Sequence, residues 1–375
     1  MPVPGINLTV LIGKSSPSPA PKFLVEEIDS VEVTQSDDGS SGFQILFRAG
    51  RAGNKDLEDY RMIKNPLLQV FNRVILIVTV GAKPQVLMDG VITNQQFSPS
   101  LRPGDSTFTI TGEDISIMMD LEEKSQSYVA QDEATIARVI LAKYAKYGVK
   151  PEVIDPPLKD RPTRNNWIPL QSNMTDFKYL QKIGERYGFV FHVTPGPVSG
   201  TSTAYWGPPK QKAQPQNPLT VNMSSFTNVE SINLQNNGLS ATVLKGKVQD
   251  RKTNKIQQVS KLRSDRRRLA SKPALTSQSA RRSKQFSQTG VNTAEANAYA
   301  QGIVDSSVDD VVTITGEIDI VRYGTPLVLR RLVTLRGVGT TYDGLYYVKN
   351  VTHKLKQGSY KQDFTITREG LGSTI

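Results

Sequence analysis

The sequence between positions 326 and 367 decides the expected fold, because it contains three runs that favour strands. They read Pro-Leu-Val-Leu-Arg-Arg-Leu-Val-Thr-Leu at 326–335, Leu-Tyr-Tyr-Val-Lys-Asn-Val at 345–351 and Gln-Asp-Phe-Thr-Ile-Thr at 362–367. Such runs are rich in the β-branched and aromatic residues that strands prefer. The dipeptide Asp343-Gly344 lies just before the second run and is a strong hairpin signal. This part of the chain therefore predicts antiparallel β-structure in which Asp343 and Gly344 set the hairpin register.

The region upstream of these runs continues the β pattern and adds one helix. Strands are expected at 229–234, 241–248 and 311–321. An Ala-rich stretch from 293 to about 307 predicts a helix with Thr293 as its N-terminal cap. The C-terminal part of the chain is thus expected to be a β region with a helix inserted in it.

The N-terminal part of the chain predicts another β region. Runs rich in Val, Ile, Thr and Phe indicate six strands, at 6–12, 23–33, 42–49, 74–80, 85–93 and 106–111. The stretch 36–40, Ser-Asp-Asp-Gly-Ser, is a strong turn between two of them. Strands at this spacing are typical of a sandwich or a small barrel, and not of a parallel α/β sheet.

The middle of the chain changes to a helical period at two places. The first helix is expected after the cap Asp132 and before Gly148, which supplies a left-handed stop. Its apolar face is Ile136, Val139, Ile140, Tyr144 and Tyr147. The second helix follows Asn173 or Thr175 and ends at Gly188, before a strand that begins at Phe189. Its apolar face is Phe177, Leu180, Ile183 and Tyr187, which we expect to pack in the core.

These patterns divide the chain into three parts. A length of 375 residues is well above the roughly 150 residues of an average domain, so more than one domain is expected. We predict a β region at 1–115, an α/β region with two helices at 116–225 and a second β region at 226–375 that carries a basic insertion at 250–290. The fold class is therefore mainly β with a smaller α/β part.

The net charge of +11 comes from one segment. Between Lys245 and Lys284, fourteen Lys or Arg residues accompany two Asp residues, so this stretch carries +12 and the remainder of the chain carries −1. An electrostatic partner must therefore meet this segment. Its Ser, Lys, Arg, Gln and Ala composition predicts a long exposed loop or a flexible strand pair. The residues expected to make the contact are Arg263, Arg266, Arg267, Arg268, Arg281 and Arg282.

Residues suited to catalysis or to metal binding are scarce. The chain has no Cys, and its two histidines, His192 and His353, lie far apart in the sequence. No spacing of His and Cys offers the three or four ligands that a metal site needs. The pairs Glu122-Glu123 and Asp309-Asp310 are adjacent, so each is expected to be solvated charge and not a catalytic pair. We expect no enzyme activity, no cofactor and no metal, and we expect His192 to be a structural polar residue.

Two further motifs are incomplete. No Gly-x-Ser-x-Gly elbow is present for a serine nucleophile. The sequence Gly337-Val-Gly339 lacks the third glycine and the phosphate-binding lysine of nucleotide sites. The most apolar stretch, 74–80, is much shorter than the roughly 20 residues of a membrane helix, and the N-terminus has no signal-peptide pattern. We expect synthesis in the cytoplasm and no membrane segment.

Two segments follow the patterns of a known family. The first is Gln-Ser-Asn-Met-Thr-Asp-Phe-Lys-Tyr-Leu-Gln-Lys-Ile-Gly-Glu-Arg-Tyr-Gly-Phe-Val-Phe at 171–191, followed downstream by Trp206-Gly-Pro. The second is the ordered series 324–329, 333–339, 343–353 and 360–368. Both resemble the late control D family of phage tail proteins. Those proteins are baseplate hubs and are similar to the hub part of type VI secretion spikes and to the hubs of contractile injection systems. One departure is Arg330-Arg331, where the resemblance leads us to expect a Pro-Gly turn or another small residue, so the shape of that hairpin is expected to differ.

The resemblance implies a structural protein. In the family, each subunit has two tube-like β-barrels that flank a helix-containing middle part, and three subunits form a ring that adapts a threefold spike to a sixfold inner tube. The implied partners are two further copies of the chain, inner-tube or tube-initiator proteins and other baseplate proteins. Because the sequence ends shortly after Arg368, the spike is expected to be a separate polypeptide. The resemblance places the protein in a phage tail or a tail-like injection particle.

Under this reading, the residues that matter are structural. Tyr346 is expected in a barrel wall, and His353 is expected to form a hydrogen bond within a strand or at an interface, with a surface histidine as the alternative. The further structural residues are Phe177, Leu180, Tyr187, Gly188 and Trp206.

Two other interpretations of the basic segment stay open. It can contact nucleic-acid phosphates, as in a tail protein that touches DNA transiently, or it can be a solvated loop. The stretch 245–284 contains no aromatic residue, so only contacts independent of base sequence are expected.

Overall fold

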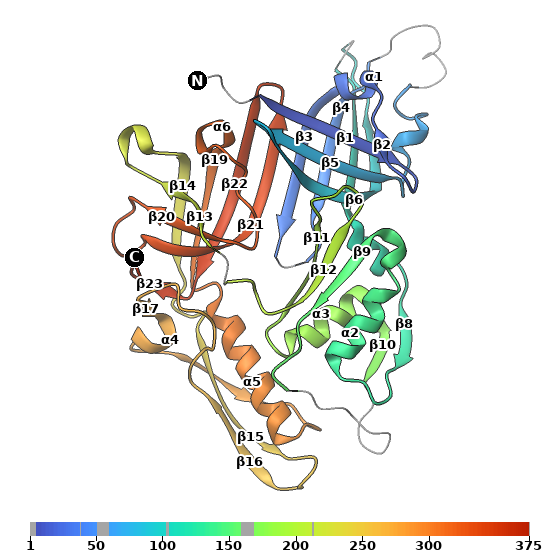
Figure 1. Ribbon diagram of the computed structural model, residues 1–375. Helices are drawn as coiled ribbons and strands as arrows, with labels where there is room; N and C mark the ends of the chain where they lie inside the picture. The colour runs from blue at the N-terminus through green and yellow to red at the C-terminus, as the bar shows by residue number, and fades with distance from the viewer. Residues whose placement is uncertain are drawn as a thin grey trace.

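A single sheet that crosses the whole upper part of the molecule dominates the fold (Figure 1). The computed structural model describes residues 5–37, 39–50, 60–102, 105–158, 169–211 and 214–374. Thirteen strands belong to this sheet, in the order β14-β19-β22-β21-β3-β4-β7-β6-β5-β1-β2, with β20 paired to β21 and β13 paired to β20. The predicted fold class, mainly β with a smaller α/β part, is confirmed.

The N-terminal half of the sheet contains the strands predicted before residue 115. They are β1 (Ile6–Gly13), β2 (Ser18–Pro19), β3 (Ile28–Ser36), β4 (Gly42–Arg48), β5 (Arg73–Val80), β6 (Lys83–Ser98) and β7 (Thr107–Asp114). A short helix, α1 (Lys22–Glu26), replaces the start of the strand predicted at 23–33. One turn of 3-10 helix lies at Pro66–Leu68 and another at Ile115–Met119. Of the predicted turn at 36–40, position 38 lies outside the described residues.

The C-terminal half contains the strands that decided the expected fold. They are β13 (Gln216–Thr220), β14 (Val229–Asn236), β19 (Val312–Asp319), β20 (Leu332–Arg336), β21 (Gly344–Lys356) and β22 (Ser359–Arg368). Two predicted strands were too long. The strand at 311–321 ends at Asp319, because the Asp319 carboxylate accepts backbone hydrogen bonds that start α6 (Ile320–Tyr323). The strand at 326–335 begins only at Leu332, because Arg330 has a left-handed backbone with φ of 61°.

Strand β21 joins the two halves, and this corrects the expectation of two closed barrels. One edge of β21 pairs with β22 over most of its length. The other edge pairs first with β20 and then, after an irregularity near Asn350, with β3 along Asn350–Lys356. Because β21 is 13 residues long, one of its edges can pair with both β20 and β3. The described strands therefore form one open path and no closed ring.

The helix-containing part lies below this sheet in Figure 1. Helix α2 (Glu133–Ala142) and helix α3 (Asp176–Glu185) accompany β8 (Lys124–Ser127), β9 (Val149–Val153), β10 (Leu170–Met174), β11 (Val190–Pro195) and β12 (Ser202–Gly207). Asp132 caps α2 and Thr175 caps α3, as predicted. A 3-10 turn at Ala145–Tyr147 follows α2 before the left-handed Gly148. Val139, expected on the apolar face, is 39% exposed and lies on the solvent side.

The basic segment was predicted to be a loop or a flexible strand pair, and that prediction was too simple. It contributes to a three-stranded sheet of β15 (Thr242–Gln249), β16 (Ile256–Lys261) and β18 (Arg282–Phe286), with β15 in the centre. Helix α5 (Thr293–Val308) covers β15 and β16. The strands are stable because Leu244, Val259 and Phe286 are buried. Between β16 and β18 lie β17 (Lys272–Pro273), which pairs with β23 (Gly370–Leu371), and α4 (Ala274–Ser277).

Helix α5 also connects the basic sheet to the helix-containing part. Its cap is Asn292 and not Thr293, since Asn292 and Glu295 form a reciprocal capping box. At Gly302 a Cβ atom would lie 2.5 Å from the carbonyl carbon of Tyr187 and 2.6 Å from the backbone nitrogen of Gly188. Only a glycine permits this approach between α5 and the end of α3. Gly188 therefore has a packing role in addition to its left-handed turn, with φ of 64°.

Candidate functional site

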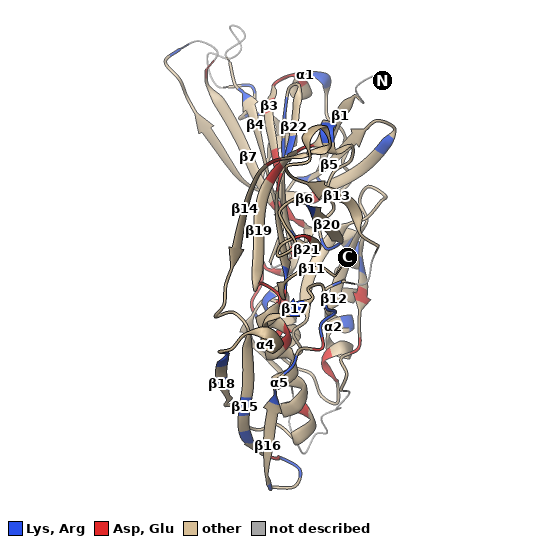
Figure 2. Cartoon of the chain, turned by 90° about the vertical axis from the view of Figure 1, so that its left-hand side faces the viewer, with Lys and Arg blue, Asp and Glu red and all other residues tan. Residues whose placement is uncertain are grey.

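The cationic side chains of the basic segment lie on an exposed projection of the molecule. Strands β15, β16 and β18 carry Lys245, Lys247, Lys261, Arg282 and Lys284, and these strands contain no Asp or Glu. All of these side chains except Lys261 are exposed, and Lys261 is partly exposed. Figure 2 shows the Lys and Arg positions on β15 and β18, with α5 beside them. The segment is therefore an ordered cationic surface.

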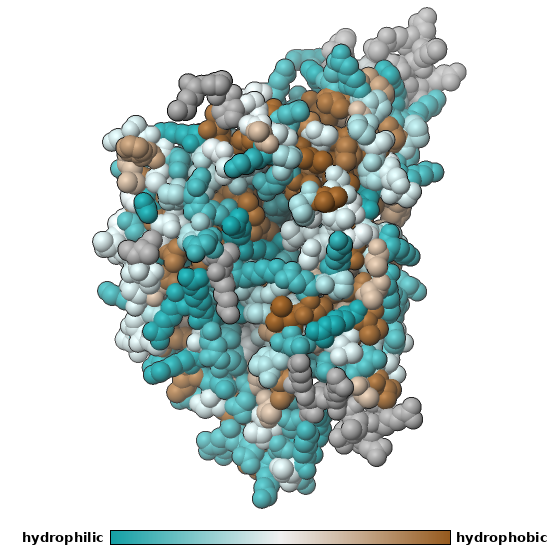
Figure 3. Space-filling view, viewed as in Figure 1, coloured by the Kyte–Doolittle hydropathy of each residue, from teal (hydrophilic) through white to brown (hydrophobic). Residues whose placement is uncertain are grey.

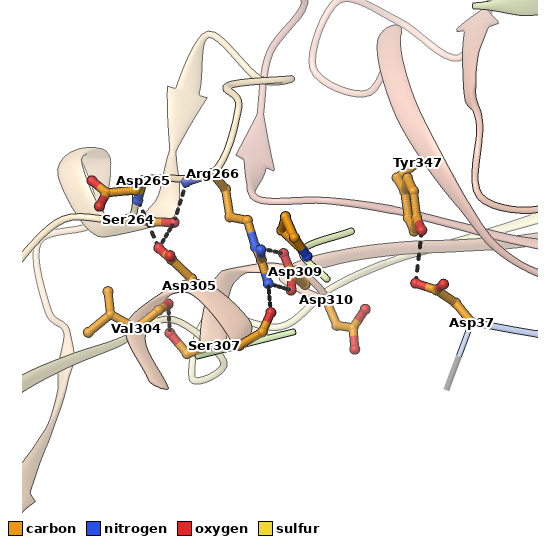
Figure 4. Close-up of polar contacts among 12 residues, drawn as sticks. Asp37, Ser264, Asp265, Arg266, Val304, Asp305, Ser307, Asp309, Asp310 and Tyr347 are labelled. Carbon is orange, nitrogen blue, oxygen red and sulfur yellow. Dashed lines mark hydrogen bonds and ion pairs between the residues drawn. The ribbon is translucent and has the colours of Figure 1, made fainter. Parts of the chain in front are cut away.

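The six arginines predicted to contact a partner are not brought together as one patch. Arg266 is withdrawn from solvent, because its guanidinium donates to both carboxylate oxygens of Asp309 and to the carbonyl of Gly188 (Figure 4). Arg267 and Arg281 each donate to a backbone carbonyl nearby. Arg266 alone among the six is partly buried, and the five exposed arginines lie on two separate segments, 263–268 and 281–282. Their role in an interaction stays a prediction.

A buried ionic cluster at the meeting point of the three parts was not found from the sequence. Arg330 Nε donates to Asp37 Oδ1 at 3.0 Å, and its two terminal nitrogens donate to the Ser36 carbonyl at 2.5 Å and to Thr194 Oγ1 at 2.8 Å. The Tyr347 hydroxyl donates to Asp37 Oδ2 at 2.9 Å (Figure 4). The only sequence signal was the departure of Arg330-Arg331 from the Pro-Gly turn or small residue that the resemblance leads us to expect.

Burial sets the electrostatics of this cluster. Asp37 is 5% exposed and Arg330 is 8% exposed. Burial raises the pKa of Asp37 above its usual range, and the adjacent Arg330 guanidinium opposes that rise. Burial also raises the pKa of Tyr347 well above its usual value. Two charges in such a place are stable only as a hydrogen-bonded pair, so the cluster fastens β3, β11 and β21 to one another.

His192 lies next to this cluster and is buried, as expected for a structural residue. Its Nδ1 is 3.9 Å from Asp37 Oδ1 and has no hydrogen-bond partner among the described residues. Burial, with a smaller contribution from Arg330, lowers the pKa of His192 well below its usual value. The imidazole is therefore neutral near pH 7 and does not compete with Arg330 for the carboxylate of Asp37.

His353 is fully buried and holds strands together, so the surface alternative is wrong. Gln362 accepts a hydrogen bond from the Leu327 amide through its oxygen, so its nitrogen faces His353 Nδ1 at 3.1 Å. The Tyr360 hydroxyl lies 2.6 Å from the same nitrogen. Since an amide nitrogen only donates, Nδ1 accepts and the imidazole is neutral. Burial lowers the pKa of His353 to about 3.

This arrangement predicts a pH-dependent stability. The folded pKa of about 3 lies below the ordinary value of 6.5, so the stability contributed by the neutral ring is complete above pH 6.5 and is lost as the pH falls towards 3. Between pH 8 and pH 5 the free energy of unfolding should fall by about 2 kcal/mol through this group alone. Urea unfolding of the wild type and of His353→Asn at both pH values measures the difference. An equal decrease in both proteins contradicts the assignment, because His192 is present in each.

The remaining predicted structural residues of the middle part pack in one core. Phe177, Leu180, Tyr187 and Trp206 are all buried. The indole of Trp206 donates to the Leu180 carbonyl at 3.0 Å and meets the ring of Phe189 edge-on at a centroid distance of 5.1 Å. The rings of Phe177 and Phe191 are in contact at 5.4 Å. These contacts join α3 to both β11 and β12.

Of the predicted hairpin residues, Asp343 lies between β20 and β21, and Gly344 is the first residue of β21. Asp343 Oδ1 accepts the Val338 amide hydrogen at 2.9 Å, and Gly344 has φ of 127° and pairs with Leu335. Tyr346 is fully buried, and its hydroxyl donates to the Tyr342 carbonyl at 2.6 Å. The guanidinium of Arg368 lies over the Tyr346 ring and donates to the carbonyl of Asp343. These contacts are consistent with a role in register, which stays a prediction.

The described part of the chain contains no group of three or more His, Cys, Asp or Glu residues placed to hold a metal ion. Within the same residues, no helix has both the length and the apolar character needed to cross a membrane.

No protein-family model and no curated protein matches this sequence. The fold, in contrast, matches solved structures over almost its whole length. A tail protein from Neisseria meningitidis MC58 superimposes with a TM-score of 0.65 at 12% identity, and the match covers 98% of each chain. The 43 kDa tail protein of prophage MuSo2 from Shewanella oneidensis gives a TM-score of 0.66 at 10% identity, covering 97% of this chain and 99% of the other.

A component of the type VI secretion system from E. coli shares the fold more distantly. Its TM-score is 0.55 at 10% identity, and the match covers 91% of this chain and 73% of that protein. The chain thus has the fold of phage tail proteins, and this fold extends to secretion-system proteins. The resemblance inferred from the two sequence segments is confirmed at the level of fold.

Proposed function

We propose that this chain is a structural baseplate hub protein of a contractile tail or injection particle. In this proposal, three copies form a ring that adapts a threefold spike to a sixfold inner tube. The particle is assembled from cytoplasmic components, and the ring contacts a separate spike protein, inner-tube or tube-initiator proteins and other baseplate proteins. The boundaries proposed for its parts remain 1–115, 116–225 and 226–375.

The observation that carries the proposal is the division of the large sheet into two matched halves. Six strands of five or more residues lie on each side of the β3–β21 junction: β1, β3, β4, β5, β6 and β7 on one side, and β13, β14, β19, β20, β21 and β22 on the other. One chain therefore offers two similar β units, so three chains around a threefold axis offer six. This is the number that a sixfold tube needs.

The surface of the upper β part supports assembly. Figure 3 shows apolar side chains gathered on this face. A groove of about 670 Å³ runs between the two halves, where Ile6, Leu8, Val25, Val321 and Leu355 line it. Leu355 is buried, Ile6 and Leu8 are partly exposed, and Val25 and Val321 are exposed. An apolar groove open to solvent is more typical of a protein that binds a neighbour than of a lone monomer.

The alternative, a tail protein that binds nucleic acid through 245–284, has less support. Two arginines of the segment, Arg251 and Arg266, pair with Glu295 and Asp309 of the same chain. The one aromatic side chain in its three strands, Phe286, is buried, so no base can stack there.

Light scattering tests the ring directly. At high micromolar concentration the chain alone should give a mass three times its 41.4 kDa, and with its spike protein it should give a complex that contains three copies of the chain. A monomer under both conditions contradicts the proposal.

A further inference from the structure

The small sheet of the basic segment ends in an unpaired strand. Strand β18 pairs in parallel with β15 through Thr242↔Arg282 to Gly246↔Phe286. Across the described residues, no strand pairs with the other edge of β18, and no backbone hydrogen bond joins 282–286 to a segment other than β15. Residues 282–285 are all exposed. The edge therefore presents backbone N–H and C=O groups to solvent, where an extended chain can add as a further strand.

Cationic side chains flank this edge on both faces of the sheet. Arg282 and Lys284 share the face of Leu244 and Phe286, because the register places Arg282 beside Thr242 and Lys284 beside Leu244. Lys245 and Lys247 alternate with these residues, so they lie on the opposite face. The side chains of Arg282 and Lys284 form no hydrogen bond or ion pair with any described residue. Their charge is available to a partner.

We propose that the β18 edge binds an extended acidic polypeptide of a partner protein, which adds to the sheet as a fourth strand. Backbone hydrogen bonds to β18 align the peptide, and Asp or Glu side chains on its two faces meet Arg282 and Lys284 on one side and Lys245 and Lys247 on the other. This binding does not depend on the ring, because every residue that it uses belongs to one copy.

The positive charges and the open backbone edge favour an acidic extended peptide over a second copy of the chain and over nucleic acid. A second copy of the chain is disfavoured, since two β18 edges side by side would bring Arg282 and Lys284 of both copies together. Nucleic acid is disfavoured because the exposed faces offer no aromatic ring for stacking and because phosphate oxygens only accept hydrogen bonds, so they leave the carbonyl groups of the edge unpaired. An acidic strand satisfies both the charges and the backbone groups.

Fluorescence anisotropy with the full chain tests the proposal. The probe is a labelled twelve-residue Glu-Thr peptide that repeats Glu-Glu-Thr-Thr, so that an extended strand carries Glu on both faces. The comparison peptide has Pro in place of every second Thr. Both peptides carry the same charge, but proline removes backbone donors and disfavours pairing in a sheet. We expect the proline peptide to bind at least about tenfold more weakly, a difference of roughly 1.4 kcal/mol. Equal binding of the two peptides, or no binding of either, overturns strand addition.

Two double variants locate the site. Arg282→Glu with Lys284→Glu should weaken binding of the Glu-Thr peptide by about tenfold or more. The matched control, Lys252→Glu with Lys255→Glu, makes the same charge change in the exposed turn between β15 and β16 and should leave the affinity within about twofold. Equal losses in both variants indicate non-specific attraction and overturn the site. A labelled twelve-base-pair DNA duplex that binds the wild type more tightly than the peptide overturns the choice of partner.

Discussion

Replacing Arg330 by alanine is expected to lower the free energy of unfolding by about 3–5 kcal/mol. The substitution removes three side-chain hydrogen bonds and leaves the Asp37 carboxylate buried beside the neutral His192. Ser36 is the last residue of β3 and Asp37 follows it, Thr194 lies in β11, and the Arg330 amide donates to the Val348 carbonyl of β21. The loss should therefore loosen all three parts at once. Urea unfolding at pH 7, followed by circular dichroism, measures the change.

The neighbouring arginine supplies the control. Arg331 is exposed and adjacent in sequence, so Arg331→Ala should change the stability by no more than about 0.5 kcal/mol. A second variant, Arg330→Gly, separates the effect of backbone strain on stability from the effect of losing the side chain. Because glycine tolerates the φ of 61°, this variant should be more stable than Arg330→Ala by about 1 kcal/mol. If Arg330→Ala and Arg331→Ala unfold at the same urea concentration, the cluster does not hold the parts together.

Replacing Trp206 by alanine should also be severe, with a loss of about 3–5 kcal/mol. The indole is fully buried, fills the space between Gly184 of α3 and Phe189, and donates to the Leu180 carbonyl. Alanine leaves a cavity and removes the hydrogen bond from the indole to that carbonyl. Trp206→Phe keeps most of the volume and should lose about 1–3 kcal/mol, which is the part due to the hydrogen bond and to imperfect fit.

Substitution of an exposed aromatic residue provides the control for the Trp206 variants. Phe226 is 78% exposed in the turn after β13, so Phe226→Ala should have little effect on the unfolding midpoint. Thermal unfolding of the three variants ranks them in the order Phe226→Ala, Trp206→Phe and Trp206→Ala, from the most to the least stable. A Trp206→Ala protein as stable as the Phe226→Ala protein would show that β12 does not depend on this contact.

The sequence was sufficient for the parts of the fold that rest on local signals. The caps Asp132 and Thr175, the left-handed glycines Gly148 and Gly188, and the strands on either side of Asp343-Gly344 follow from spacing and composition alone. Hydrophobic alternation marks a strand but not its neighbour across the sheet. The pairing of β3 with β21 links residues more than three hundred positions apart, so two separate barrels were expected in place of one continuous sheet.

The positive charge of the candidate site could be predicted from the sequence, but its three-dimensional structure could not. The cationic residues of 245–284 were evident, whereas the sheet that they form depends on burial of Leu244, Val259 and Phe286 against α5. Asp37 and Arg330 could not be paired from the sequence, because a long-range ion pair has no periodic signature. The assignment of His353 needed the positions of Tyr360 and Gln362, which only the folded hairpin brings to it.

The proposed ring of three copies between a tube and a spike can be tested by electron microscopy of particles that contain the chain with a tag on one terminus. We expect three tagged copies per particle and threefold density at the junction, with the two six-stranded halves of each chain arranged as six units facing the tube. A single copy per particle, or a tag located away from that junction, would contradict it.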